Sequence, residues 1–499
     1  MSDKFAPLSV KQLYEYVFSD NSGHTMLGIP APLFFNQEKN ALLQTGIFNQ
    51  PIATPFGVAA GPHSQMAQNI MAAWLCGARY IELKTVQTLD DLKISKPCID
   101  MQDEGYNCEW SQELKIEESF NEYLKAWIFI HLISHQLGFG NHPQTVFNMS
   151  VGYNYEGICN DNVQWFLKKM NDCSLEKEAM VNSIAEWYPE IKQITIPSRI
   201  SDNITLSTMH GCPPEEIEKI GRYLIEEKKL HTFIKLNPTL LGPEELRRIL
   251  NTLHHHKTTV PDSAFEHDLK YENAVSIIKS LKAAAQKNNV FFGIKLTNTL
   301  ESLNHRKVFN PEEKMMYMSG KALHPLSINI ARKLQNDFNG QLNISFSGGA
   351  DCFNISRIIE CGIYPVTVSS DLLKPGGYGR MHQYAQNISD LLHTHKIQNL
   401  SEYFEKIKSS KNTTKLNTYA DEVLEDKRYS KDMFSEPDIK TGKKLSWFDC
   451  ISAPCVNTCP TNQDIPDYLY YTAEKKFDDA MGDTENQPTA CRMRYGLRP

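Results

Sequence analysis

Residues 53–88 constrain the fold of this chain more than any other stretch. Their sequence, ATPFGVAAGPHSQMAQNIMAAWLCGARYIELKTVQT, predicts a buried strand at 56–60, a Gly-Pro-His-Ser loop, a helix from about 65 to 75 and a second buried strand at 79–83. A strand, a helix and another strand in that order form a parallel pair, because the helix carries the chain back along the sheet. Ligands of parallel sheets bind where the strands end, which here means near Gly61 and Lys84.

Further short apolar runs predict that this unit repeats around a closed barrel. With the first two predicted strands, the six further runs make eight strands. Helices are predicted between several of them, at 163–170, 214–227, 243–255, 273–287, 326–337 and 354–360. Eight strands alternating with helices predict an α/β fold of the (β/α)8 TIM-barrel type, in which ~250 residues is typical. An open doubly wound sheet is the alternative, but the GxGxxG fingerprint of its dinucleotide-binding form is absent. The six further runs are 145–149, 204–206, 233–236, 290–296, 342–346 and 365–368.

Composition divides the rest of the chain into three parts. An N-terminal extension, 1–52, precedes the predicted barrel at 53–388. Residues 389–444 are polar and charged, as expected for peripheral helices and a linker. Residues 445–499 form a predicted C-terminal helical segment that contains a cluster of cysteines.

The charge and hydropathy of the chain exclude several classes of partner. The net charge is −7 and the basic residues are scattered, so no nucleic-acid or anionic-membrane surface is predicted. The sequence begins without a basic and apolar leader, and no stretch has eighteen consecutive apolar residues. We therefore expect a cytoplasmic protein that binds neither nucleic acid nor membrane.

Lysines and small residues follow several predicted strands. Lys84, Lys235 and Lys295 each come at or just before a strand end, where barrel active sites are built. The Ser347-Gly348-Gly349 turn, with a helix close behind, offers backbone N–H groups suited to a phosphate. Gly320, Ser369 and Ser370 could complete this cradle, whereas the simpler alternative is that the glycines only form tight turns.

These motifs resemble, in order, those of a known group of flavoproteins. ATPFGVAAG, ELKTV, KLNP, LTNT, SGKALHPLSIN and FSGGADC are similar to motifs of FMN-dependent dihydroorotate dehydrogenases and of the FMN barrel of dihydropyrimidine dehydrogenases. With STMHGCPPEEIE, KLNPTLLG and DLLKPGGY, the chain most closely resembles the family named for a selenate reductase subunit. The resemblance covers about residues 25–480 and implies an FMN-dependent oxidoreductase acting on CH–CH groups of a small molecule.

The resemblance also implies a role for individual residues. Lys235 matches a lysine beside the flavin, where a positive charge stabilises the anionic reduced ring. The residues that match the loops around the isoalloxazine are Ala59, Ala60, Gly61, Lys84 and Thr85. Those that match the phosphate-binding loops are Gly320, Ser347, Gly348, Gly349, Ser369 and Ser370. Those that match the groups around a pyrimidine ring are Asn154, Asn298 and Thr299.

One position departs from the family pattern. The relatives carry Asn-x-Ser-Cys or Asn-x-Ser-Ser, whose last residue transfers a proton, but this chain has Thr-Leu-Ser-Thr ending at Thr208. A threonine hydroxyl is a much poorer acid or base than a thiol, whose unperturbed pKa is ~8.5. Thr208 acting with His210, or Cys212 from the next turn, are the candidates for proton transfer.

The clustered cysteines predict a metal centre. Cys450, Cys455 and Cys459, followed by Pro460, have spacing suited to iron–sulfur or zinc ligation. They resemble the start of the 4Fe-4S module of glutamate-synthase small subunits, but three cysteines leave the ligand set incomplete and Cys491 is the candidate fourth ligand. The sequence leaves the family pattern after about residue 481, so we expect a partial, truncated iron–sulfur segment.

Three functions remain open from the sequence. The first is a flavin oxidoreductase subunit that relays electrons between iron–sulfur centres and a small substrate, with molybdenum- or iron–sulfur-containing subunits as electron-transfer partners. The second is a Schiff-base lyase that uses Lys295. The third is a non-catalytic electron-transfer subunit.

Overall fold

The computed structural model describes most of the chain and divides it into two compact units. The described residues are 5–18, 25–89, 97–101, 104–108, 113–140, 142–207, 211–306, 308–410, 413–431 and 465–485. The first unit is Met1–Ser430 and the second is Lys431–Pro499. None of the helices in these ranges combines the length and the apolar character needed to cross a membrane.

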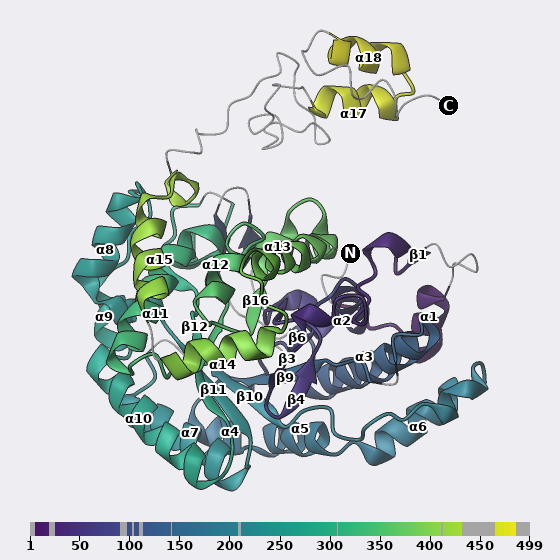
Figure 1. Cartoon of the computed structure of the whole chain (residues 1–499), viewed down its shortest axis with the longest axis horizontal. Helices are drawn as coiled ribbons and strands as arrows, with labels where there is room; N and C mark the ends of the chain where they lie inside the picture. Colours follow the sequence, from purple (N-terminus) through teal and green to yellow (C-terminus); the bar gives the residue numbers. More distant parts are fainter. Residues whose placement is uncertain are drawn as a thin grey trace. The chain divides into compact units, whose positions relative to one another are not determined.

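Eight parallel strands form a closed barrel in the first unit (Figure 1). Their order around the barrel is β10, β11, β12, β15, β16, β5, β6 and β9, so strands that follow one another in the sequence are neighbours. The predicted TIM barrel is therefore confirmed, and each predicted strand overlaps an observed one. The strands are β5 Phe56–Val58, β6 Tyr80–Glu82, β9 Val146–Val151, β10 Asn203–Ser207, β11 His231–Leu236, β12 Phe292–Leu296, β15 Ile344–Phe346 and β16 Val366–Val368.

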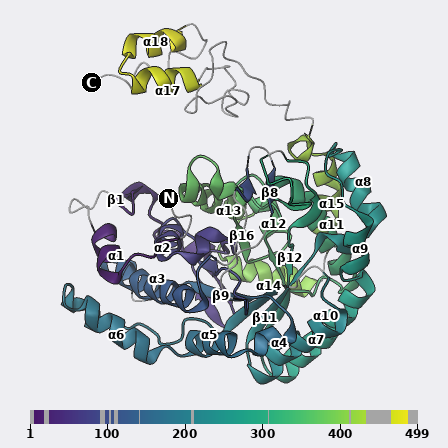
Figure 2. The ribbon, with the colours of Figure 1, turned by 180° about the vertical axis from the view of Figure 1, so that it is seen from behind.

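Helices surround the strands in both views of the ribbon (Figures 1 and 2). Helices α7 and α8 start at Pro214 and Pro243, each followed by two glutamates, because proline and acidic residues favour the first helical turn. A π-helical turn, Tyr223–Glu227, ends the segment in which a single helix was predicted. The helices that match predictions are α2 Ala67–Leu75, α5 Asp161–Asn171, α7 Pro214–Arg222, α8 Pro243–Thr252, α10 Tyr271–Lys287, α11 His324–Asp337 and α12 Ile355–Glu360.

Other helices lie in segments to which no single helix was assigned. The longest is α3, Ile116–Gln136, which packs on α2 and is largely buried. Three more follow the last strand: α13 Met381–Thr394, α14 Leu400–Ser410 and α15 Thr414–Glu425. Helix α13 begins before the polar segment predicted at 389–444, and the other two lie within it. Helix α15 packs on α11 inside the first unit. The remaining α-helices are α1 Val10–Val17, α4 Tyr155–Cys159, α6 Ser174–Ile184 and α9 Asp262–His267, with α17 Ile465–Ala473 and α18 Phe477–Glu485 in the second unit.

A hairpin packs apolar side chains against residues at the beginning of several barrel strands. Strands β3 (Thr45–Ile47) and β4 (Gln50–Ile52) pair antiparallel, and Phe48 lies in the turn between them. The Phe48 ring lies 5.7 Å from the ring of Phe233 and 5.1 Å from that of Phe291. Such aromatic contacts stabilise beyond simple burial, so the hairpin anchors the N-terminal extension to this end of the barrel.

A second sheet contributes to the opposite end, where the strands finish. Strands β7 (Ile99–Asp100), β8 (Gly105–Asn107), β13 (Leu300–Leu303) and β14 (Met315–Ser319) form four antiparallel strands in the order β13, β14, β8, β7. We call it the mouth sheet. Arg306 donates to Asp100 at 2.7 Å, and the Tyr106 and Thr258 hydroxyls lie 3.2 Å apart. The sequence did not predict this sheet, because its halves come from insertions about 200 residues apart and its strands are short.

An ion pair crosses the barrel interior. Lys295 of β12 pairs with Glu82 of β6, a strand on the opposite side of the barrel, and also donates to Ser345 at 3.1 Å and Thr367 at 2.9 Å. The second Glu82 oxygen accepts the Ala60 backbone N–H at 3.1 Å. Lys295 is fully buried and Glu82 nearly so. Burial lowers the pKa of Lys295, while the Glu82 carboxylate opposes this shift.

We predict that breaking this pair destabilises the protein strongly. Lys295→Met leaves the Glu82 carboxylate buried without its cation, and should lower the free energy of unfolding by about 3–5 kcal/mol. The double variant Glu82→Gln/Lys295→Met should recover most of that loss. Urea-unfolding midpoints measure the effect, with the exposed Lys287→Met as control. A Lys295→Met midpoint equal to that of the control would refute the prediction.

Candidate functional site

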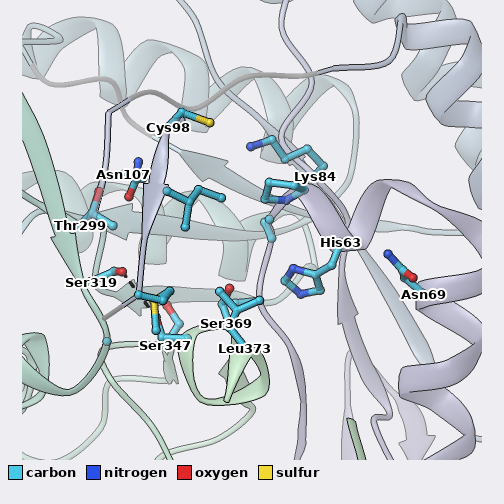
Figure 3. Close-up of a pocket in the computed structure, with 18 of the residues that line it drawn as sticks. His63, Asn69, Lys84, Cys98, Asn107, Thr299, Ser319, Ser347, Ser369 and Leu373 are labelled. Atoms are coloured by element: carbon cyan, nitrogen blue, oxygen red, sulfur yellow. Dashed lines mark hydrogen bonds between the residues drawn. The ribbon is translucent and has the colours of Figure 1, made fainter. Parts of the chain in front are cut away.

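A cavity of about 630 Å³ lies where the barrel strands end (Figure 3). Its walls come from strand β11 and from the loops after β5, β6, β12, β15 and β16, together with the mouth sheet. This volume is typical of pockets that hold small ligands. The residues singled out from the sequence that line it are Ala59, Ala60, Gly61, Lys84, Lys235, Thr299, Gly320, Ser347, Gly349, Ser369 and Ser370.

Two lysines give one part of the cavity a positive character. Lys84 and Lys235 line it, and Lys84 exposes only 2% of its surface. Burial lowers the pKa of Lys235 to about 8; Glu82 opposes this shift, and the positive charges of Lys295 and Lys84 add to it. A buried cation that lies near other cations gains stability when an anionic group binds beside it. This part of the site therefore favours a ligand that carries or develops negative charge.

Small residues form another part of the wall, which we call the glycine–serine cradle: Ser319, Gly320, Ser347, Gly349, Ser369 and Ser370. Gly320 and Gly349 have φ of +71° and +67°, a backbone conformation that favours glycine. A Cβ on Gly349 would lie 2.2 Å from the Gly320 carbonyl oxygen, so the two loops touch backbone to backbone. The glycines thus do form tight turns, and the same turns line the cavity.

A small recess beside the cradle carries two more lysines. Lys321 and Lys374 line it together with Gly320, Gly349, Ser370 and two aspartates, Asp351 and Asp371. Lys374 pairs with Asp371 at 3.2 Å. Burial lowers the pKa of Lys321 to about 8, and the positive charge of Lys374 adds to this effect. The Asp351 carboxylate opposes this shift, so the aspartates of the recess already balance part of its positive charge.

The cradle is held from behind by buried hydrogen bonds. His324 bonds to the Gly348 carbonyl oxygen at 2.9 Å and to the Tyr419 hydroxyl at 2.7 Å. Asn354 donates to the Gly349 carbonyl at 3.0 Å. Burial lowers the pKa of His324 to about 3, so its ring is neutral at pH 7. Helix α15, which follows the barrel, thereby contributes to the shape of the site.

The loop after β5 presents polar atoms to the cavity. His63, Gln68 and Asn69 line the wall, and Figure 3 shows His63 and Asn69 in this position. The His63 Nε2 and Gln68 Oε1 atoms are buried and have no hydrogen-bond partner among the described residues. Burial, with the positive charge of Lys84, lowers the pKa of His63 to about 4. Buried polar atoms normally have partners, so these two atoms point to a ligand.

Gly61 allows the loop after β5 to fold tightly. A Cβ there would lie 2.9 Å from the His63 ring, so glycine makes room for the imidazole to fold back. The Gly61 backbone N–H donates to Ser64 at 3.1 Å, and Gln65 accepts from the backbone of Glu113 at 3.1 Å. The sequence pointed to Gly61 for close approach to a ligand, and in the structure Gly61 lines the cavity, with the His63 ring nearest to an added Cβ.

Several residues that the sequence placed at the site lie outside the cavity lining. Asn154 caps helix α4 by accepting from Gly157 at 2.8 Å, and Asn298 donates to Asn237 at 2.8 Å. Thr85 bonds to Ser150 at 2.8 Å, and Gly348 packs against Ser327 behind the cradle. These residues position the walls instead of facing the cavity. Lys295 and Cys212 also lie outside the lining.

Other predicted residues cannot be placed in this geometry. Thr208 and His210 of the proposed proton-transfer loop lie outside the described residues. The three clustered cysteines, Cys450, Cys455 and Cys459, also lie outside them. Within the described ranges, His, Cys, Asp and Glu side chains nowhere gather in a group of three that could hold a metal ion, and no cysteine is in a disulfide.

The sequence did not predict the cavity-lining residues that lie outside the barrel strands and the loops that follow them. His63 was noted at a strand end without a role, and the mouth sheet was not predicted at all. No local pattern shows that residues near 100 fold over the barrel, because their partner strands lie near 300. The missed residues are Phe5, Ala6, Cys98, Ile99, Met101, Tyr106 and Asn107.

Comparisons with known proteins identify the family of the chain. Residues 27–431 match the family described as "Oxidoreductase YgfK, N-terminal TIM-barrel domain". The chain is 39% identical over 504 aligned positions to the "Putative oxidoreductase YgfK" of Escherichia coli (strain K12) and, equally, to that of Escherichia coli O157:H7. The alignment covers 96% of this chain and 47% of each relative, so the chain spans about half the length of the curated relatives it matches.

A solved structure was also found among the similar folds. A ligand-free DHODH from Eimeria tenella superposes with a TM-score of 0.46 and 15% sequence identity, over 78% of this chain and 96% of that one. The family match covers most of the present chain, and the barrel that it describes is the one observed. The chain therefore belongs to the YgfK oxidoreductase family, whose N-terminal TIM-barrel domain it contains.

Proposed function

We propose that this protein is an FMN-dependent oxidoreductase subunit. The observation that carries the proposal is a single cavity of about 630 Å³ that joins a glycine–serine cradle to two lysines, of which Lys84 is buried and Lys235 partly buried. A flavin mononucleotide needs both features, because it has a phosphate at one end and a ring that becomes anionic when reduced. Membership of an oxidoreductase family supports the same chemistry.

The cradle fits the phosphate. Serine hydroxyls and tight glycine turns line this part of the cavity, and Lys321 in the adjoining recess would add to the attraction for a phosphate. The loops after strands seven and eight of TIM barrels commonly bind phosphates, and here those strands are β15 and β16. Gly320, Gly349 and Ser370 line both the cavity and the recess, so they would hold the phosphate between them.

The lysine-bearing part fits the ring. Ala59, Ala60 and Gly61 would lie along the isoalloxazine, and the Ala60 backbone is fixed by its hydrogen bond to Glu82. Lys84 and Lys235 would hold positive charge beside the ring, while Thr299 offers a hydroxyl to a substrate. When bound, FMN would supply the capacity to accept and donate electrons. The mouth sheet contributes walls that restrict water around the reacting groups.

The finer parts of the proposal extend beyond this cavity. We propose that the substrate is a small molecule oxidised or reduced at a CH–CH bond, and that electrons pass to or from iron–sulfur centres, as in the selenate reductase subunit family that the sequence resembles. Cys450, Cys455 and Cys459 would be ligands of one such 4Fe-4S centre, and subunits that contain molybdenum or iron–sulfur centres would be partners. The motifs quoted from the sequence support this part.

The geometry gives no support to a Schiff-base lyase. Lys295 would have to form an imine with a carbonyl substrate, but it is fully buried and bonded to Glu82, Ser345 and Thr367. It does not line the cavity, so a ligand held there would not reach its amine. The lysines that line the cavity are Lys84 and Lys235, which fit the flavin proposal.

We predict that the purified chain binds FMN and that binding weakens as the pH rises through about 8. Lys235 and Lys321 have pKa values of about 8, so both carry their charge below that pH and lose it above. Quenching of flavin fluorescence measures the affinity. Riboflavin, which has no phosphate, should bind more weakly and depend less on pH. A protein that takes up no FMN at any pH would refute the proposed function.

We predict that Gly349→Ala abolishes FMN binding. The added Cβ would lie 2.2 Å from the Gly320 carbonyl oxygen, so the cradle must open. Gly138→Ala is a matched control, because Gly138 has nearly the same φ, +66°, but nothing within 4 Å of an added Cβ. The control should lose only about 1–2 kcal/mol of stability, from its strained backbone, and keep its affinity for FMN. Equal FMN affinity in both variants would contradict the role of the cradle.

We predict that Lys235→Met makes the bound flavin harder to reduce. Removing the positive charge disfavours the anionic reduced ring, so the midpoint potential should fall by roughly 30–60 mV, the equivalent of about 1.4–2.8 kcal/mol for a two-electron couple. A reductive titration against a dye of known potential measures it. Lys287→Met, on the surface, should leave the potential unchanged. An unchanged potential in an FMN-loaded Lys235→Met protein would place Lys235 away from the ring.

A further inference from the structure

Two cysteines lie directly opposite each other in the mouth sheet. Strands β7 and β8 pair antiparallel with Ile99 opposite Asn107, and the same register places Cys98 opposite Cys108, just beyond the two strands. The Cys108 backbone N–H donates to the Cys98 carbonyl oxygen at 3.0 Å, so the pairing continues to these residues. Opposed residues of antiparallel strands place their side chains on the same face of the sheet. The two thiols are therefore neighbours.

The spacing of such a pair suits a disulfide. Hydrogen-bonded partners in antiparallel strands have Cα atoms ~5.5 Å apart, and disulfides usually join Cα atoms ~4.4–6.8 Å apart. The Cβ atoms of opposed residues are ~4.5–5.5 Å apart, slightly more than the ~3.5–4.5 Å of a disulfide. Cys98 and Cys108 lie just outside their strands, where the backbone is less constrained and can close this difference. Both are reduced cysteines in the structure.

The two thiols differ in their access to small molecules. Cys98 is partly exposed and lines the cavity, and Figure 3 shows its side chain in this wall. Cys108 exposes only 4% of its surface and belongs to the hydrophobic core. A small oxidant that enters the cavity would therefore meet Cys98 first. An accessible thiol next to a second, resolving thiol is the usual arrangement of redox-sensitive cysteines.

A bond between these cysteines would change how strand β7 is held. Strand β7 is the edge of the mouth sheet and contains two residues, yet Ile99 of this strand and the adjoining Met101 line the cavity. Besides β8, the Arg306–Asp100 ion pair holds it. Short edge elements with few contacts open locally at low cost. A covalent link to Cys108, beside a strand that pairs on both sides, would fix this part of the wall.

We propose that Cys98 and Cys108 form a reversible disulfide that locks β7 to the mouth sheet in an oxidising medium. The oxidant is a low-molecular-weight disulfide. The Cys98 thiolate attacks one of its sulfurs, which breaks the small S–S bond, forms a mixed disulfide and releases one small thiol. The Cys108 thiolate then attacks the Cys98 sulfur, which forms the protein disulfide and releases the second small thiol. The two cysteines lose two electrons and two protons in total, and the small disulfide gains them.

This modification goes beyond the proposed flavin function and requires no flavin. Glutathione disulfide, added to the purified full chain without denaturant, is the probe. Residues 94–115 form one tryptic peptide that contains both cysteines and no other, because Lys96 precedes a proline and Lys115 is the next basic residue. After oxidation this peptide should be lighter by two hydrogens and take up no iodoacetamide, and after dithiothreitol it should take up two alkyl groups. A peptide that stays reduced at every ratio of glutathione disulfide to glutathione would overturn the proposal.

Single variants test the order of the two steps. Cys108→Ser should stop the reaction at the mixed disulfide, with glutathione retained on Cys98. Cys98→Ser should leave Cys108 unmodified, because that thiol is buried. Cys159→Ser is the control, since it removes another partly buried thiol, on helix α4, and should form the link as the unaltered chain does. Glutathione on Cys108 instead of Cys98 would overturn the assigned order, and the mapping of the unaltered chain stands even if a variant fails to fold.

Hydrogen exchange tests the locking of β7. In the protein without added FMN, the amides of residues 98–108 should exchange several-fold more slowly after oxidation than after reduction. Cys98→Ser should show no difference between the two conditions. Equal exchange rates in the oxidised and reduced forms of the unaltered chain would overturn the locking. A chain that binds no FMN but forms the disulfide would overturn the flavin function and support this inference, so the two failures are distinguishable.

Discussion

The buried pair of Glu82 and Lys295 joins the barrel to the site it carries. One Glu82 oxygen meets the Lys295 ammonium inside the barrel, and the other accepts the Ala60 N–H at the edge of the cavity. Because buried charges are stable only when paired and hydrogen-bonded, the strands that carry them must keep their register. That register determines the position along the barrel axis at which the β5 loop and Lys84 reach the cavity. The core and the site therefore share one electrostatic constraint.

Charged side chains and small residues line different parts of the cavity. Lys84 and Lys235 supply positive charge beside the β5 loop, while glycine turns and serine hydroxyls form the cradle across from them. Neutral imidazoles support each part: His324 bonds to the back of the cradle, and His63 faces the cavity. Burial keeps the pKa of both rings well below 7, so neither adds charge. This division suits a ligand with a phosphate at one end and a reducible ring at the other.

Elements outside the barrel complete the site. The mouth sheet brings Cys98 and Asn107 to the cavity, and helix α15 reaches the cradle through Tyr419 and His324. The barrel thus provides the lysines and the turns, whereas inserted segments provide the outer walls. This arrangement agrees with the general behaviour of TIM barrels, in which loops at the carboxyl ends of the strands vary and determine the chemistry.

The sequence by itself determined the barrel, because eight apolar runs separated by helical patterns leave few alternative folds. It also placed Lys84, Lys235, Gly349 and Ser369 near strand ends, where their side chains or backbone could meet. It did not distinguish residues that face the cavity from those that support it: Asn154 became a helix cap, and Lys295 became part of the core. Side-chain direction at a strand end depends on register across the whole barrel, which local sequence does not encode. Only the tertiary structure decided that Cys98 lines the cavity, because the mouth sheet forms by pairing between residues about 200 positions apart.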